Sequence, residues 1–174
     1  MRIVEVAYEW ADLEVTKDSW NAAGMAQIRQ DAEACAAAGK YLRVILLHKF
    51  GTYPAYMTTG NAHTVEMTDV VGRNITLNKP ETLARLKALY ARVITELKST
   101  SQAKAGFYGF VLQETSLGGG AYFGDPLVKT AWFNNLRAFH VWLSQNGRLK
   151  DFSTVAPGGR LFWQMINANI SEVD

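Results

Sequence analysis

With 174 residues, of which 48% are hydrophobic and 20% charged, the sequence has the size and composition of one globular domain with a single core. The formal net charge is only +2, so the sequence lacks the strongly basic character expected of a protein that binds nucleic acid or an anionic membrane. It has no apolar run long enough to span a bilayer and no signal-peptide pattern at residues 1–6, and we expect a cytoplasmic protein by default.

The N-terminal part of the sequence predicts a strand, a helix and a second strand. Residues 3–10 are rich in β-forming side chains, and residues 41–47 form a near-continuous apolar run. Between them, residues 24–38 carry apolar side chains at the spacing of one helix face, and Gly39 is the expected stop. This helix contains Cys35, the only cysteine, which excludes an intrachain disulfide and is expected to be a small buried residue.

The connection at about 50–79 is long for a compact domain, so we expect it to be functional or to contain small elements, such as short strands at 65–71 and 74–77. A helix is predicted to follow, running to about residue 98, with Asn78 as its N-cap and Pro80 in its first turn. The apolar stripe of this helix should face the core. Its basic residues are expected on the solvated side: Arg85, Lys87, Arg92 and Lys98.

The C-terminal part predicts a strand at 107–112, a helix from Asp125 to about Gln145 and a last strand at 160–166. His140 lies in the middle of that helix beside two aromatic residues, which indicates a packing role rather than a catalytic one. The resulting order is β-α-β-α-β-α-β. Helices that alternate with doubly buried apolar strands indicate a parallel sheet with right-handed crossovers.

The predicted fold is therefore a single α/β domain over residues 1–174 with a parallel sheet. Four strands leave an open sheet with two raw edges, and such edges promote pairing with another chain. We expect a homodimer.

Parallel strands deliver the residues that follow them to one rim of the sheet, where α/β folds place their chemistry. These strand-end residues are Tyr8, Glu9, Trp10, His48, Lys49, Gln113, Glu114, Trp163, Gln164 and Asn167. Aromatic rings beside amide and carboxyl groups suit an oligosaccharide or polysaccharide, because sugar C–H faces stack on rings while hydroxyls need directional partners. The alternative for Trp10 and Trp163 is a role in the core.

Glu114 is the strongest candidate for a catalytic group. It follows the buried strand at 107–112 and precedes the glycine run 118–120. The alternatives are a carboxylate that closes the strand end or pairs with a lysine. A phosphate cradle at 118–120 is only weakly indicated, because these glycines precede aromatic residues rather than a helix.

Four short motifs, taken together, resemble a known family. They are Tyr-x-Trp at 8–10, Gly-Lys-x-Leu at 39–42, His-Lys at 48–49 and Gln-Glu-Thr at 113–115. The pattern is similar to the middle of a (β/α)8-barrel glycoside hydrolase of the large retaining clan, with the four strands here matching barrel strands two to five. The resemblance implies that Glu114 is the general acid/base, because that clan carries this Glu at the end of barrel strand four. It also implies that the fold is part or half of a TIM barrel, of which a complete one takes about 250 residues. In the expected homodimer, two half-barrels would then complete each other; the alternatives are a fragment of a longer barrel and a sheet that is covered in another way.

The sequence departs from the clan in two ways. Gln113 stands where the clan usually has Asn, and it could contact the sugar with a longer reach. The clan's nucleophile is a second Glu on barrel strand seven, which lies beyond the four strands seen here. Glycoside hydrolysis needs two carboxyl groups. Glu9 is the other strand-end carboxylate, and Asp125 is a weaker candidate.

These observations favour a glycoside-hydrolase-like enzyme, with His48 and Lys49 adding polar contacts. The main alternative is a non-catalytic glycan-binding or structural remnant of a barrel. A lyase or aldolase using Lys49 would need a desolvated lysine of low pKa and ranks below both. A metal site from Glu9, His48, His63 and Glu114 matches no ligand signature, so we expect neither metal nor cofactor.

Overall fold

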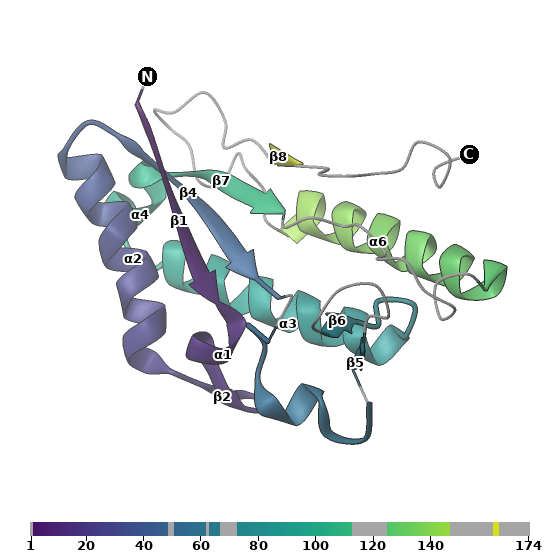
Figure 1. Cartoon of the computed structure of the whole chain (residues 1–174). Coiled ribbons are helices and arrows are strands. Elements are labelled where there is room, and N and C mark those ends of the chain that lie inside the picture. The colour runs from purple at the N-terminus through teal and green to yellow at the C-terminus, as the bar shows by residue number, and fades with distance from the viewer. Residues whose placement is uncertain are drawn as a thin grey trace.

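The computed structural model shows an α/β fold built on a parallel sheet (Figure 1). It describes residues 2–48, 51–61, 63–66, 73–112, 125–146 and 162–163. The main sheet has four strands: β1 (Ile3–Glu9), β4 (Tyr41–Leu47), β7 (Phe107–Leu112) and β8 (Phe162–Trp163). They lie in the order β1-β4-β7-β8, and every neighbouring pair is parallel. Strands that follow the chain order across a parallel sheet are the arrangement of a TIM barrel, so the predicted fold class is confirmed.

Three long helices connect these strands: α2 (Ala22–Ala37), α3 (Pro80–Leu97) and α6 (Pro126–Asn146). Their bounds agree with the sequence periodicity to within two residues. The predicted N-cap of α3 is wrong, because the cap residue is Lys79 and Pro80 opens the helix directly. None of the helices in the described part of the chain is long and apolar enough to cross a bilayer.

A short helix, α4 (Ser101–Gly106), precedes β7 and was not expected from the sequence. The hydroxyl oxygen of Thr100 accepts a hydrogen bond from the Ala103 amide and caps its first turn. The end of α4 packs so closely on α2 that a Cβ atom at Gly106 would lie 1.8 Å from the carbonyl oxygen of Ala32. A glycine is therefore required where α4 passes over α2.

Smaller elements follow the carboxyl ends of β1 and β4. Helix α1 (Trp10–Leu13) and the hairpin of β2 (Glu14–Thr16) and β3 (Ser19–Trp20) come after β1. Two 3-10 turns, η1 (Ala55–Met57) and η2 (Thr59–Asn61), come after β4. The hairpin of β5 (Thr64–Glu66) and β6 (Arg73–Ile75) leads into α3. Figure 1 shows α1 and β2 just beyond the arrowhead of β1, at the rim where the sequence places the chemistry.

The two faces of the main sheet differ in burial. Along β4, Leu42, Val44 and Leu46 are fully buried against the helices, whereas the alternating residues between them are only partly buried. Along β1 the residues that alternate with Val4 and Val6 include Glu5 and Glu9, which are exposed. We call this second side, carrying Glu5, Ala7 and Glu9 of β1 and their neighbours Arg43, Ile45 and Leu47, the open face.

The apolar composition of β1 and β4 indicates burial on both faces, but the structure shows that only one face of these strands is well buried. In a complete barrel the corresponding side chains fill the interior together with those of all eight strands. The described strands leave this layer partly uncovered, and Glu5 and Glu9 are exposed on it.

Candidate functional site at the carboxyl end of the sheet

Several of the residues singled out from the sequence lie outside the described residues: Lys49, Gln113, Glu114, Gln164 and Asn167. For Trp163 the structure describes only its place in β8, paired with Leu112 of β7. The described part of the rim is formed by the ends of β1 and β4 and by the elements that follow them.

At the end of β1, strand alternation sends neighbouring candidates to opposite sides. Glu9 is exposed on the open face, at the N-cap position of α1, and its side chain makes no capping hydrogen bond. Tyr8 points to the other side, where its hydroxyl donates to Asp31 Oδ2 of α2 at 2.7 Å. Burial raises the pKa of Tyr8, and the hydrogen bond to Asp31 adds to the effect. Tyr8 is thus engaged by a helix and not turned toward the open face.

Trp10 is fully buried, and its indole N–H donates to Glu14 Oε2 at 2.7 Å. A ring with no exposed face cannot stack on a sugar, which fits the alternative that Trp10 belongs to the core. His48 follows β4 and is only 8% exposed. Glu9 is therefore the candidate that the described part of the rim offers to a ligand.

The structure also reveals a buried ionic cluster that sequence reasoning missed. Its centre is an ion pair between Glu14, which is 0% exposed, and Arg85, which is 7% exposed. The expectation that Arg85 lies on the solvated side of α3 is wrong. The helical period gave the signal, because Arg85 lies four residues before the fully buried Leu89 and so shares its side of the helix.

Glu14 accepts four hydrogen bonds, which is the full capacity of a carboxylate. Oε1 accepts from the guanidinium of Arg85 and from the backbone amide of Asp18 at 2.7 Å. Oε2 accepts from the indole of Trp10 at 2.7 Å and from the hydroxyl of Tyr56 at 3.0 Å. All four partners are donors within the protein, so the Glu14 carboxylate is fully engaged inside the cluster.

Arg85 joins the rest of the cluster. Its Nη1 donates to Asp18 Oδ1 at 2.6 Å, and its Nε donates to the hydroxyl of Tyr56 at 3.0 Å. Its guanidinium carbon lies 5.8 Å from the centre of the Tyr56 ring. Burial alone would lower the pKa of Arg85, but the hydrogen bonds to Asp18 and Tyr56 and the charge of Glu14 raise it above its ordinary value.

A second ionic group lies on the open face, within the strands rather than at their ends. Arg43 of β4 pairs with Glu5, its register partner on β1. The guanidinium of Arg43 also lies 5.8 Å from the centre of the Tyr108 ring, and Tyr108 contacts Tyr41 with ring centres 6.0 Å apart. The contacts with Glu5 and Tyr108 accommodate the charge of Arg43 on a face that also carries the apolar side chains of Ile45 and Leu47.

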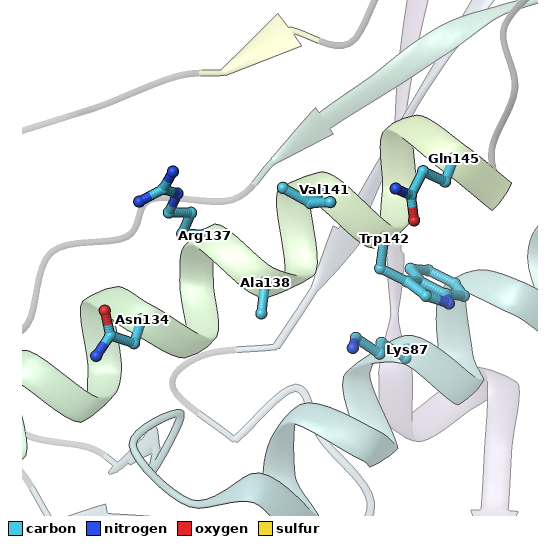
Figure 2. Close-up of a pocket in the computed structure, with 7 residues that line it drawn as sticks. All are labelled: Lys87, Asn134, Arg137, Ala138, Val141, Trp142 and Gln145. Carbon is cyan, nitrogen blue, oxygen red and sulfur yellow. The ribbon is translucent and has the colours of Figure 1, made fainter.

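A groove of about 420 Å³ lies between the outer sides of α3 and α6 (Figure 2). Figure 2 shows Lys87 of α3 beside the ring of Trp142, with Asn134, Arg137 and Gln145 also along α6. Among the described residues, no strand end contributes to its lining, so the groove is separate from the described part of the candidate rim. Among the residues that the structure describes, no group of three acidic, histidine or cysteine side chains could hold a metal ion.

Comparison with known proteins places the fold but not the activity. No family model matches the sequence, and no curated protein matches it. Among solved structures, the chain is similar to GH5_18 from Bifidobacterium longum subsp. longum, with a TM-score of 0.56 and 16% identity over 95% of this chain and 35% of that one. A variant of the same enzyme in complex with Manβ1-4GlcNAc gives a TM-score of 0.57 at 16% identity, over 95% and 34% of the two chains.

An α-galactosidase from Lactobacillus brevis is also similar, with a TM-score of 0.55 at 8% identity over 95% of this chain and 22% of that chain. The chain thus spans about a third or less of the length of these enzymes. At such low identity the similarity shows the fold alone, which is a glycoside-hydrolase-like partial barrel.

Proposed function

We propose that this chain is part of a carbohydrate-active, glycoside-hydrolase-like barrel, with Glu114 as its general acid/base. The observation that carries the proposal is the parallel sheet in the order β1-β4-β7-β8, which is similar to solved glycoside hydrolases over 95% of the chain. Glu114 comes two residues after the end of β7. A residue at that place in a parallel sheet belongs to the rim at which barrel enzymes act.

Glu9 is the candidate for the second carboxyl group. It is the last residue of β1, lies on the open face, is exposed and makes no capping hydrogen bond. A separation of about 5–5.5 Å between the two carboxyl groups gives retention of configuration, and about 6.5–9.5 Å gives inversion. In either case, acid catalysis near neutral pH requires that burial raise the pKa of the acid.

The remaining rim residues serve as substrate contacts in this proposal. Amide groups of Gln113, Gln164 and Asn167 hold sugar hydroxyls, and Trp163 supplies a stacking face. Lys49 adds a charged donor, and His48 orients its neighbours from a buried position. Trp10 and Tyr8 take no direct part, because one is fully buried and the other is bonded to Asp31.

The decisive experiment compares Glu114→Gln with the unmodified protein on a panel of aryl glycosides and β-linked disaccharides. Loss of turnover with saccharide binding retained is the expected result, because the amide keeps the shape but cannot supply a proton. Glu81→Gln, an exposed carboxylate in the first turn of α3, is the matched control and should leave turnover unchanged. Hydrolysis that survives in Glu114→Gln would refute the assignment.

The second candidate is a non-catalytic glycan-binding or structural barrel remnant, favoured by the open face left by a partial barrel. It predicts saccharide binding without turnover, and an absence of binding counts against both candidates. A second copy whose strands pair with the two edges of the sheet would cover the open face and complete a barrel as a homodimer. Light scattering at several concentrations tests this, since a stable monomer would contradict the dimer.

A further inference from the structure

The buried cluster consists of Trp10, Glu14, Asp18, Tyr56 and Arg85. We propose that Glu14 and Arg85 are positioning residues, which hold Glu9 and the two connections after β1 and β4 in place at the candidate rim. We call this cluster, with the two connections that it holds, the clamp. Its link to catalysis rests on the proposed function, whereas the clamp itself rests on contacts that the structure describes.

The cluster joins three segments that are far apart in the sequence. Glu14 begins β2, Tyr56 lies in η1, and Arg85 lies in the second turn of α3. The backbone amide of Ala11 also donates to the carbonyl oxygen of Thr52 at 2.9 Å, so the two connections are tied to each other as well as to α3. The described residues of both connections form only short elements, and this cluster ties them to α3 through Arg85.

Glu9 is placed through its neighbour. Trp10 follows Glu9 directly, is 0% exposed and is held by the hydrogen bond from its indole to Glu14. A fixed Trp10 ring fixes the first turn of α1 and thereby the backbone of Glu9, its N-cap residue. The Glu9 side chain has no capping bond of its own, so its place depends on the backbone. A catalytic carboxyl group must be held to within about 1 Å.

Burying two charges is a poor way to gain stability, because desolvation offsets most of their attraction. A bidentate or branched guanidinium does, however, impose a geometry that apolar packing does not. Arg85 donates with one rigid fork to three acceptors, Glu14 and Asp18 in the connection after β1 and Tyr56 in the connection after β4. Such a cluster therefore fixes the positions of the segments that it joins more than it stabilises the fold, and at the rim the positions of side chains decide the chemistry.

Hydrogen exchange followed by mass spectrometry on the full chain tests the clamp without any substrate. In Arg85→Gln, exchange should speed up about tenfold or more in residues 10–20 and 52–58, the factor expected for losing a hydrogen bond to a charged group. Arg29→Gln is the matched control, because Arg29 pairs with Glu96 between α2 and α3, away from the rim. Unchanged exchange at 10–20 and 52–58, or acceleration spread equally through α2 and β4, would overturn the clamp.

Two further variants keep the test decisive. Arg85→Lys retains the charge but cannot reach three acceptors, so its exchange should fall between those of Arg85→Gln and the unmodified protein. Tyr56→Phe keeps the ring and the ion pair and removes only the hydroxyl, so it serves if Arg85→Gln does not fold. It should speed exchange at 52–58 more than at residues 22–37, and a result like that of Arg29→Gln would refute the clamp.

The link to catalysis has its own readout. If Arg85 acts by placing Glu9, Arg85→Gln should lower turnover of an aryl glycoside strongly on its own but have little further effect once Glu9→Gln is present. Independent, multiplying losses would refute positioning of Glu9. If the unmodified protein neither binds nor hydrolyses any saccharide, the proposed function fails, whereas the exchange pattern still decides whether the clamp exists.

Discussion

Gly106 offers the sharpest test of how the helices are packed. A Cβ atom at this position would lie 1.8 Å from the carbonyl oxygen of Ala32, 2.7 Å from its carbonyl carbon and 3.1 Å from the amide nitrogen of Ala36. All three atoms belong to the backbone of α2, so no rotamer change can relieve the clash. To restore ordinary contact at about 3.5 Å, α4 and α2 would have to move apart by more than 1 Å.

Gly106→Ala should therefore lower stability by about 3 kcal/mol or more, the upper part of the range for overpacking. The better helix propensity of alanine returns only about 0.5–1 kcal/mol. For a chain of this size the net loss lowers Tm by roughly 6 °C or more in a thermal melt. Because Gly106 directly precedes β7, the displacement also moves the strand that leads to Glu114.

Gly39→Ala is the matched control. Gly39 has a left-handed φ of 63° but no atom within 4 Å of its added Cβ, so the change costs only the backbone strain of about 1–2 kcal/mol. Ala32→Gly should not rescue Gly106→Ala, because the clash involves the Ala32 carbonyl and not its methyl group. A Gly106→Ala protein that melts at the unmodified temperature, or rescue by Ala32→Gly, would refute this account of the packing.

Three further predictions concern buried polar groups. Arg85→Met should cost about 3–5 kcal/mol in chemical denaturation by leaving Glu14 charged and unpaired, and adding Glu14→Gln should return at least about 1 kcal/mol; simple additivity would contradict the ion pair. Tyr90→Phe should be neutral or stabilising, because the Tyr90 hydroxyl is fully buried with no hydrogen-bond partner among the described residues, and a loss above about 1 kcal/mol would reveal a partner. Burial raises the pKa of both Tyr8 and Tyr90 above the ordinary value near 10. The unfolded chain therefore loses these protons first, so stability is intact below about pH 10 and falls as pH rises beyond it. Tyr8→Phe should reduce that alkaline loss in a pH series of melts, and an unchanged slope would contradict the buried hydroxyl.

The main strands and helices could be predicted from the sequence, because the spacing of apolar residues that indicates them is a local pattern. The apolar run at 41–47 matches β4, and the spacing through residues 24–38 matches α2 to within two residues. Helix α4 escaped prediction because its six residues give less than two turns of periodicity. The candidate rim was found from the rule that parallel strands end on one side, which requires no knowledge of side-chain contacts.

By itself, the sequence determined the α/β class, the parallel strand order and the placement of polar residues after each strand, because these follow from periodicity and chain direction. Only the tertiary structure decided which of the described ones are exposed and which are buried. Glu9 and Trp10 are neighbours in the chain, yet one is exposed on the open face and the other is buried against Glu14. The helical period places Arg85 on the same side of α3 as Leu89, but only the fold brings Glu14, 71 residues away, into contact with it. Side-chain burial depends on which distant segments pack together, and local sequence does not encode that.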